Sequence, residues 1–500
     1  MSTPARKTPV NVVRADAKTG RAQSLGFSQE FVDAPVLLER LSAIVGESNL
    51  TLDPAALSSA LSEPRGQYRG KALCLLFPDT TQRVARTLEF CNSHRIGVVP
   101  QGGNTGLVGG QTPDASGQQV VLSLSRLRQM RRIDPANNSI IVEAGVTLAE
   151  AQQYAASADR YFPLSLASEG SCTIGGNLAT NAGGVHVIAY GMTRDLVMGV
   201  EVALADGRIL STLGKLPKDN TGYDLTRLFI GSEGTLGVIT AATLKLFPRP
   251  RSRAVALLGL RDPVQALALL DLVKAGAGPA LQAFELMPRI GVELVLAHIP
   301  GARDPLVGAY PWYALVELAD FVSGEAEARA ARLFEEALEQ GVANDACLAQ
   351  SLEQAAALWK LRESLSEAQK REGASIKHDI SVPIRRIPEF IAEAGDRIAE
   401  KFPEARPVPF GHMGDGNIHY NISQPPGADR DAFLAQGATI NDIVHDLVGA
   451  FGGSISAEHG IGQLKRDLLA RTADPVALDL MRALKGLFDP NGVLNPGKLL

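Results

Sequence analysis

The feature that most constrains the fold is the stretch from residue 73 to residue 247, where short apolar runs alternate with glycine-rich turns. The runs are ALCLLF, IGVVP, VVLSL, IIVEAGV, VMGVEVALADG, LFIGSEG and LGVITAATLKLF. They are rich in Val, Ile and Leu and end at Gly, Asp or Pro, which is typical of buried strands in an α/β arrangement. After them the sequence FPRPRSR predicts a domain boundary near residue 250, because proline cannot donate to a strand ladder.

Beyond that boundary, long amphipathic segments predict helices at residues 263–275, 324–340, 348–372 and 388–402. Between them, WYALVELA, KHDISVP and PVPFGH are predicted strands. This pattern predicts an α+β substrate domain at 251–455, with an antiparallel sheet that helices cover on one face. The last residues, 456–500, contain the helical segment ALDLMRALKGLF and are predicted to complete a functional site between the two domains. The whole chain is therefore expected to be α+β.

A length of 500 residues exceeds what one core usually organises, which predicts two large domains. The net charge of -5 gives no electrostatic footprint for nucleic acid. The four cysteines lie far apart without a CxxC pair, which disfavours disulfides and indicates a reducing compartment. No apolar run approaches the roughly 20 residues of a membrane helix. Residues 1–27 are polar and basic, and are either a disordered extension or a weak organelle transit peptide. The first large domain is expected at 28–250.

Three loops in the first half are rich in glycine and small polar residues: VVPQGGNTGLVGG, SEGSCTIGGNLATNAGG and GSEGTLG. Glycine lets successive backbone N–H groups approach an anion, which makes a nest for phosphate. Any one loop could be a simple tight turn, but three in one domain predict a single extended ligand that bears phosphate. A Rossmann site and an NTPase are disfavoured, because neither GxGxxG nor GxxxxGK[ST] occurs.

These loops, with YGMTRDLVMGVEV and DNTGYDLTRLFIGSEGTLGVIT, resemble the FAD domain of the vanillyl-alcohol oxidase type flavoproteins. The resemblance runs from about residue 27 to residue 500. Within this type of flavoprotein, the loops resemble more specifically the branch that holds D-lactate, glycolate and D-2-hydroxyglutarate dehydrogenases. It implies noncovalent FAD, since Asn104 stands where covalent relatives place a histidine. The FAD-binding residues that it implies are Pro100, Gln101, Gly102, Gly103, Asn104, Thr105, Gly106, Leu107, Ser168, Glu169, Gly170, Thr173, Ile174, Gly175, Gly176, Asn177, Ala179, Thr180, Asn181, Gly183, Gly184, Glu233, Gly234, Gly237, Val238, Ile239 and Asn495.

The segment PVPFGHMGDGNIHYNI contains the dipeptide Asp415-Gly416, a strong signal for a tight primed turn. With this dipeptide at the tip, His412 is predicted to lie directly opposite His419. Cross-strand neighbours have Cβ atoms about 4.5–5.5 Å apart, which suits two imidazoles that converge on one metal ion. Asn421 is predicted to share their face.

A third part of this constellation is GGSISAEHGIGQ, which carries Glu458 and His459. In the resembling dehydrogenases, the residues that match His412, His419 and Glu458 bind the metal, and the match of His459 is the catalytic base. Two imidazoles and one carboxylate leave positions open for substrate, as in catalytic zinc sites. Zinc is the first choice, and manganese, cobalt and iron suit the same ligands.

The chemistry that follows is the oxidation of a 2-hydroxy acid. The substrate would chelate the metal, His459 would remove the hydroxyl proton, and hydride would pass to flavin N5. Arg362 and Ser366 are predicted on one helical face, with Lys377 at the start of the next strand. An arginine fork and a lysine suit a carboxylate.

In resembling dicarboxylate dehydrogenases, an arginine, a hydroxyl residue and a lysine at this spacing hold the distal carboxylate, near the match of Asn421. Their hydroxyl residue is commonly threonine, where this chain has Ser366. This favours D-2-hydroxyglutarate, with D-malate as a shorter analogue and D-lactate or glycolate as the alternative.

Other classes stay open: a flavin oxidase, an ether-lipid synthase of the same type, and a noncatalytic FAD-binding subunit. The expected electron acceptor is electron-transfer flavoprotein or a quinone-linked partner. We further expect a homodimer in the cytoplasm, or in the mitochondrial matrix if the source is eukaryotic.

Overall fold

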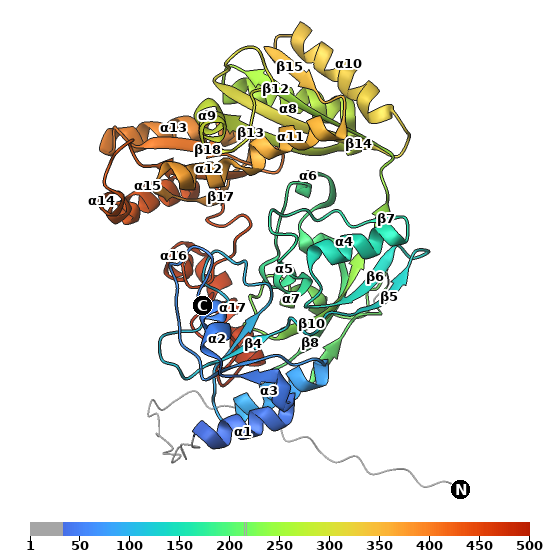
Figure 1. Cartoon of the computed structure of the whole chain (residues 1–500), viewed down its shortest axis with the longest axis vertical. Helices are drawn as coiled ribbons and strands as arrows, with labels where there is room; N and C mark the ends of the chain where they lie inside the picture. Colours follow the sequence, from blue (N-terminus) through green and yellow to red (C-terminus); the bar gives the residue numbers. More distant parts are fainter. Residues whose placement is uncertain (1–33, 215, 217) are drawn as a thin grey trace.

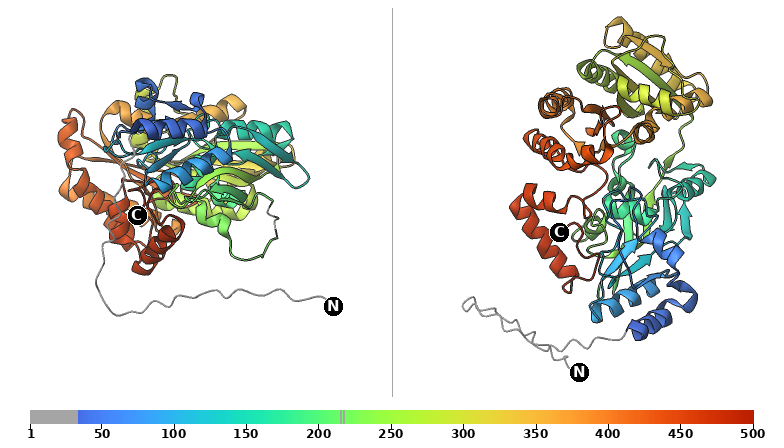
Figure 2. Two further views of the ribbon diagram at one scale, coloured as in Figure 1. Left: turned by 90° about the horizontal axis from the view of Figure 1, so that it is seen from below. Right: turned by 60° about the vertical axis from the view of Figure 1, so that its left-hand side comes forward.

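The computed structural model describes residues 34–214, 216 and 218–500. The predicted extension at residues 1–27 lies outside this range. The described chain forms two parts stacked along its longest axis, with the blue-to-green residues in the lower part of Figure 1 and the yellow-to-orange residues in the upper part. The red C-terminal residues return to the lower part, as the right view of Figure 2 also shows.

The lower part begins with a four-stranded sheet in the order β1-β2-β4-β3. The central pairs β2–β4 and β4–β3 are parallel, and β1 pairs antiparallel with β2. Helix α3 begins after Thr80, whose side chain accepts the amide hydrogen of Arg83 as an N-cap. The elements of this region are α1 (Ala34–Val45), β1 (Leu50–Thr51), α2 (Pro54–Ala60), β2 (Cys74–Leu76), α3 (Thr81–Ser93), β3 (Val98–Gln101) and β4 (Val120–Ser123).

The second sheet of the lower part is antiparallel throughout, in the order β5-β6-β10-β8-β9. The α/β pattern predicted for this half therefore applies only to the first sheet, while the predicted α+β class holds for the whole. The elements of this region are β5 (Met130–Asp134), β6 (Ser139–Glu143), α4 (Leu148–Ser157), β7 (Arg160–Tyr161), α5 (Ile174–Thr180), α6 (Val187–Tyr190), β8 (Val197–Ala203), β9 (Ile209–Ser211), α7 (Leu225–Phe229), β10 (Val238–Lys245) and β11 (Phe247–Pro248). Strands β7 and β11 pair in a separate two-stranded sheet.

The predicted strand LFIGSEG is wrong. Its first two residues end helix α7, and the rest form a turn in which Gly231 and Glu233 adopt positive φ. Such angles do not fit an extended ladder, and the glycines allow the chain to reverse here.

The upper part contains an antiparallel sheet in the order β13-β14-β12-β15. Alternate residues of β12 point to opposite faces: Ala256 and Leu258 pack with helices α8 and α10, and Val255 and Leu257 pack with α9 and α11. Helices thus cover both faces, not one as predicted. The elements are β12 (Ser252–Leu260), α8 (Pro263–Ala277), β13 (Leu281–Pro288), α9 (Arg289–His298), β14 (Trp312–Asp320), α10 (Glu325–Glu339), β15 (Asp345–Leu348) and α11 (Leu352–Glu363).

A second, smaller sheet of the upper part is built around β19, which pairs with β16, β17 and β18. The helix predicted over 348–372 is interrupted at Ser364, where α11 ends and α12 begins. The elements are α12 (Leu365–Glu372), β16 (Ser375–Ile376), β17 (Asp379–Ser381), α13 (Ile387–Lys401), β18 (Arg406–Phe410), β19 (Asn417–Ser423), α14 (Arg430–Ala435) and α15 (Gly437–Ala450).

The C-terminal residues cross back and form α16 (Arg466–Thr472) and α17 (Pro475–Phe488) beside the lower part. Leu494 makes a parallel bridge to Val98 at the edge of the first sheet, and both residues are buried in its core. We propose that the chain divides into domains at 28–250 and 251–455, with 456–500 returning to the flavin side.

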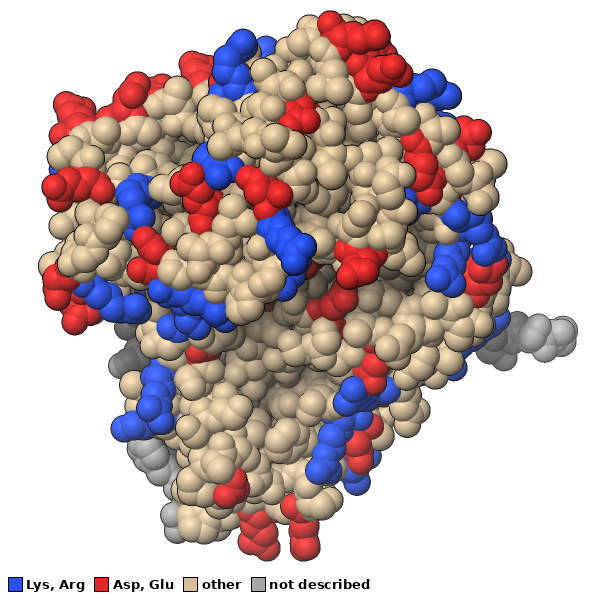
Figure 3. All heavy atoms as spheres, turned by 45° about the horizontal axis from the view of Figure 1, so that its top comes forward, with Lys and Arg blue, Asp and Glu red and all other residues tan. Residues whose placement is uncertain are grey.

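The described surface is mixed in charge: Lys and Arg side chains are interspersed with Asp and Glu on the face in Figure 3. All four cysteines are free thiols, which agrees with the sequence-based expectation. Within the described residues, no helix is both long and apolar enough to cross a membrane.

Candidate active site

A pocket of the lower part lies where the three glycine-rich loops meet. About 900 Å³ of space, part of it open to solvent, lies among these loops. Residues predicted to bind FAD that line it are Pro100, Gln101, Gly102, Gly103, Asn104, Thr105, Gly106, Thr173, Gly175, Gly176, Asn177, Ala179, Thr180, Glu233, Gly234, Gly237, Val238, Ile239 and Asn495. The lining residues that sequence reasoning missed for the cofactor are Val108, Gly110, Gln111, Leu124, Ser232 and His459.

The other predicted FAD residues do not line the pocket: Leu107, Ser168, Glu169, Gly170, Ile174, Asn181, Gly183 and Gly184. Ile174, the first residue of helix α5, is buried in the core. Gly183 instead lies against the predicted metal site, since a Cβ there would be 3.2 Å from Oε1 of Glu458.

The first two glycine loops touch each other so closely that side chains would not fit. A Cβ on Gly103 would lie 1.9 Å from the carbonyl oxygen of Ser171, and one on Gly102 would lie 2.4 Å from Oγ1 of Thr173. The glycines therefore let two loops close on one ligand. Asn104 and Asn495, which line the pocket, each keep a buried side-chain oxygen without a hydrogen-bond partner among the described residues. Such atoms suit a polar ligand like FAD.

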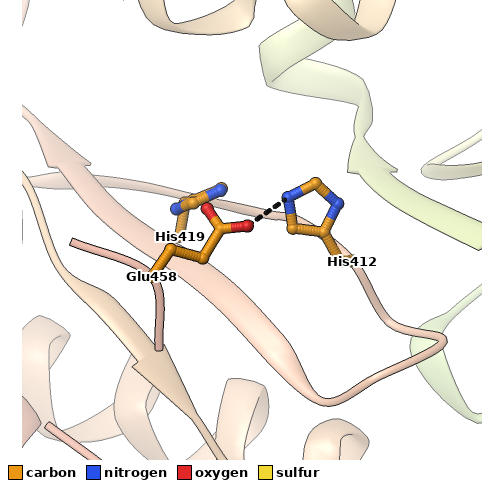
Figure 4. A group of neighbouring side chains, drawn as sticks. All are labelled: His412, His419 and Glu458. Atoms are coloured by element: carbon orange, nitrogen blue, oxygen red, sulfur yellow. Dashed lines mark ion pairs between the residues drawn. The ribbon is translucent and has the colours of Figure 1, made fainter. Parts of the chain in front are cut away.

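The predicted metal ligands come together in the upper part of the molecule. His412, His419 and Glu458 offer ligand atoms that all lie within 4.8 Å of one another. Nε2 of His412 is 3.5 Å from Oε1 of Glu458, and Figure 4 shows His419 beside this pair. The centroids of the two imidazole rings are 5.5 Å apart. Two nitrogen donors and a carboxylate are a donor set that suits zinc.

The route by which the histidines meet differs from the prediction. Phe410, not His412, pairs with His419, and the connection between the strands runs from residue 411 to 416. The two-residue primed turn was therefore wrong: Gly416 has φ +96°, but Asp415 does not have positive φ.

His412 leaves the hairpin because the loop attaches to strand β13 instead. Gly411 and Leu286 exchange two backbone hydrogen bonds of 2.8 and 3.0 Å, and the amide of Gly414 donates to Phe284. The loop is thereby held by a neighbouring sheet, which directs the ring of His412 toward His419.

A buried carboxylate that sequence reasoning missed, Glu285, connects two of the predicted groups. Nδ1 of His412 lies 2.6 Å from one of its oxygens, and Nε of Arg362 donates to the other at 2.7 Å. Burial opposes the charged form of Glu285, but His412 and Arg362 outweigh it and lower its pKa to about 2. This contact leaves Nε2 of His412 free for a metal, the arrangement by which carboxylates commonly orient metal-binding histidines.

Substitution Glu285→Gln is expected to weaken metal binding about 10- to 100-fold, because it removes the carboxylate that orients His412. It also leaves Arg362 without its anionic partner, and breaking a buried pair costs about 3–5 kcal/mol of unfolding free energy. Metal titration and thermal unfolding would measure both effects. Glu293→Gln, at an exposed carboxylate in an ion pair with Arg289, is the matched control. Unchanged metal affinity would contradict the role of Glu285.

The predicted base, His459, lies where the metal cluster meets the flavin pocket. It lines that pocket, and its ring centroid is 6.2 Å from that of His419 in a stacked arrangement. Burial lowers the pKa of His459 to about 4, with Lys465, Arg65 and Lys377 acting in the same direction and Asp379 opposing them. The imidazole is therefore neutral at pH 7, as a proton acceptor must be.

The predicted substrate residues are only partly brought together. Arg362 is buried, and its Nη2 has no hydrogen-bond partner among the described residues. Ser366, by contrast, is exposed in the first turn of α12, beyond the end of α11 at which Arg362 lies. Lys377 lies between β16 and β17 and does not open a strand. Asn421 is buried on β19, where its amide donates to Gln369.

Comparison with known proteins now identifies the family. The chain matches the model of an FAD binding domain over residues 72–213 and that of the FAD linked oxidases, C-terminal domain, over residues 249–499. It is 40% identical to a D-2-hydroxyglutarate dehydrogenase of Bos taurus, covering 96% of this chain and 85% of that one. It is 36% identical to that of Stutzerimonas stutzeri, covering 93% and 99%. The chain belongs to the D-2-hydroxyglutarate dehydrogenase family of FAD-linked oxidases.

Solved structures show the same fold at lower identity. The chain resembles p-cresol methylhydroxylase with a TM-score of 0.73 at 17% identity, covering 93% of this chain and 96% of that one. An alkyldihydroxyacetonephosphate synthase gives a TM-score of 0.72 at 16% identity, covering 92% and 86%. The fold of this family member is therefore that of the vanillyl-alcohol oxidase type flavoenzymes.

Proposed function

We propose that this protein oxidises D-2-hydroxyglutarate to 2-oxoglutarate, with FAD as the hydride acceptor and a divalent metal, zinc first, as the electrophile. One observation carries the proposal: His459, a neutral imidazole, lines the flavin pocket and also lies beside the cluster of His412, His419 and Glu458. The family relatives that carry this activity in their names add support.

Each group of residues has a separate proposed role. His412, His419 and Glu458 would hold the metal, which lowers the pKa of a coordinated hydroxyl when bound. His459 accepts the proton of that hydroxyl, and the flavin pocket beside it places FAD, when bound, to accept the hydride. The unpartnered guanidinium nitrogen of Arg362 and the ammonium group of Lys377 supply donors for the distal carboxylate. Asn421 and Ser366 remain proposed contacts of the substrate.

D-malate is proposed as a second substrate, because it keeps the distal carboxylate at a shorter distance. The alternative, a D-lactate or glycolate dehydrogenase, would leave Arg362 and Lys377 without a substrate partner. We further propose electron-transfer flavoprotein or a quinone-linked protein as acceptor, a homodimer, and a cytoplasmic location, or the mitochondrial matrix if the source is eukaryotic.

The test is anaerobic addition of D-2-hydroxyglutarate to the purified yellow protein, with metal analysis. Bleaching of the flavin absorbance is expected, and its absence would exclude the dehydrogenase in favour of the inert subunit or the synthase. A comparison of kcat/KM for D-2-hydroxyglutarate, D-malate and D-lactate tests the carboxylate site. Equal values for D-lactate and D-2-hydroxyglutarate would contradict it.

Substrate binding is expected to weaken as pH rises through about 8. Burial, with nearby Arg65 and Lys370, lowers the pKa of Lys377 to about 8. Below that pH the ammonium form binds a carboxylate, and above it the charge is lost, so kcat/KM should fall on the alkaline side. In Lys377→Met this alkaline fall should disappear at a uniformly higher KM. A pH profile of kcat/KM for both proteins is the measurement, and an identical alkaline limb in the two would contradict the assignment.

A further inference from the structure

The residues between α15 and α16, which carry both Glu458 and His459, form no helix or named strand. A catalytic base in such a segment needs other contacts to hold its position. Four backbone amides in this short stretch, at residues 458, 459, 461 and 462, donate to buried carboxylates that lie far away in the sequence.

The first carboxylate is Asp379, on strand β17 of the upper part. Its Oδ2 accepts the amide hydrogens of Glu458 at 3.0 Å and His459 at 2.8 Å. The same atom is 3.6 Å from Nδ1 of the His459 ring, and Oδ1 is 4.0 Å from Nδ1 of His419. Asp379 therefore contacts the backbone of a metal ligand and of the base, and faces the ring of the base.

The orientation of Asp379 is itself constrained. Nδ2 of Asn417 donates to Oδ1 at 3.1 Å, and the buried ammonium group of Lys465 donates to the main-chain carbonyls of Asp379 and Ile455. Lys465 thereby joins β17 to the segment that carries the base and places a positive charge near the carboxylate.

The second carboxylate is Glu233, in the loop after α7 of the lower part. Its two oxygens accept the amide hydrogens of Ile461 and Gly462, each at 2.7 Å. Both oxygens are thus engaged by protein, although Glu233 also lines the flavin pocket. Glu233 adopts φ +53°, an unusual backbone conformation for a non-glycine residue.

The segment approaches Glu233 and the backbone of Val108 so closely that only glycine fits at two positions. Gly460 has φ +82°, and a Cβ there would lie 2.8 Å from Oε1 of Glu233. Gly462 has φ +53°, and its Cβ would lie 2.3 Å from the carbonyl oxygen of Val108. The two glycines turn successive amides toward the carboxylate, as in backbone anion nests.

We propose that Asp379 and Glu233 form a two-sided carboxylate clamp that positions His459 between the flavin pocket and the metal cluster. The clamp deepens the proposed function, because it rests on His459 being the base. Asp379 holds the segment from the substrate side and Glu233 from the flavin side, so the clamp also ties the two parts of the molecule together at the reacting atoms. Both are positioning residues, since neither is argued to contact the substrate.

The test uses Asp379→Asn and Glu233→Gln, which preserve size but replace a carboxylate oxygen by a group that donates and cannot accept. Glu317→Gln and Glu143→Gln are matched controls, because these carboxylates are also buried and hydrogen-bonded but lie elsewhere. In each holoenzyme, FAD and metal content are measured first, and both should be retained.

Two readouts follow. Hydrogen exchange of peptides that cover residues 456–464 should speed up in both variants and in neither control, because the amides lose their acceptors. The anaerobic rate of flavin reduction by D-2-hydroxyglutarate should fall about 10- to 100-fold, while the substrate concentration for half-maximal rate changes little, because a displacement near 1 Å has such an effect. The double variant should lose less than the product of the single losses, since both carboxylates hold one segment.

Unchanged exchange, an unchanged reduction rate, or equal effects in the controls would overturn the clamp. If Asp379→Asn loses FAD or fails to fold, the clamp is tested with Glu233→Gln and Gly460→Ala. In Gly460→Ala the added Cβ pushes against Glu233 while both carboxylates remain. If the wild-type flavin is not reduced by D-2-hydroxyglutarate, the proposed function fails, and the exchange data alone then decide the clamp.

Discussion

Substitution His459→Ala is expected to lower the rate of flavin reduction by D-2-hydroxyglutarate about 10²- to 10⁴-fold, the usual contribution of a general base. The reason is that the imidazole lines the flavin pocket and is neutral at pH 7. Of the two carboxylates that lie beside it, Glu458 is a proposed metal ligand, and Asp379 already accepts the amide hydrogens of Glu458 and His459. Burial raises the pKa of Asp379, but His459, Lys465 and His419 outweigh it and lower that pKa, so Asp379 is a poor proton acceptor. Stopped-flow absorbance under anaerobic conditions measures the rate.

The variant should keep its FAD and its metal, because neither the glycine loops nor the three predicted ligands are altered. His298→Ala is the matched control: this partly buried histidine pairs with Glu372 and belongs neither to the lining of the flavin pocket nor to the metal cluster. Undiminished reduction in His459→Ala would remove this residue from the mechanism. Loss of FAD or metal in the variant would instead mean that His459 has a structural role.

Removal of the metal is expected to abolish most turnover while the protein remains yellow. Chelation, or Glu458→Gln, removes the group that lowers the pKa of the substrate hydroxyl, so His459 faces a much weaker acid. The loss should be at least about 100-fold, added zinc should restore the chelated wild type, and it should not restore Glu458→Gln. Metal analysis and kcat on the same samples are the measurements. Full turnover at no detectable metal would contradict the proposed metal dependence.

Metal removal should also lower thermal stability, because a ligand bound only by the folded state stabilises it by about 2.7 kcal/mol at a hundred times Kd. The pH dependence has a definite sign. Burial opposes protonation of His412, but Glu285 and Glu458 outweigh it and raise its pKa to about 9 in the metal-free protein. Metal must therefore displace a proton below that pH, and its apparent affinity should fall about tenfold for each unit that pH falls. Metal titrations at pH 6, 7 and 8 would test this.

Much of this molecule follows from local sequence pattern. The apolar runs that become β2, β3, β4, β6, β8 and β10 are readable because buried strands need such residues, and the glycine loops are readable because close approach to an anion needs them. The helices predicted at 263–275, 324–340 and 388–402 match α8, α10 and α13, whereas the one predicted over 348–372 is broken at Ser364 and α9 and α15 were not predicted. The hairpin pattern around His412 and His419 indicated a metal site, and the family resemblance implied Glu458 as the third ligand and His459 as the base.

Tertiary structure alone decided how these groups meet. The hairpin pattern predicted that His412 lies opposite His419. In the structure Phe410 takes that position, and the loop that carries His412 pairs with β13 instead, which still brings the two imidazole rings close together. The sequence signal for Glu285 is a charged residue within the otherwise apolar strand LQAFELMP. It indicates a buried carboxylate but does not predict which residues the carboxylate contacts.

The contacts that orient the site join residues far apart in the chain: 127 positions separate His412 from Glu285, 80 separate His459 from Asp379, and 228 separate Ile461 from Glu233. Sequence by itself determined which chemistry the chain contains, through residue type and local spacing. Only the packing of the two parts determined where that chemistry is placed, because long-range contacts depend on which faces of sheets and loops are buried together.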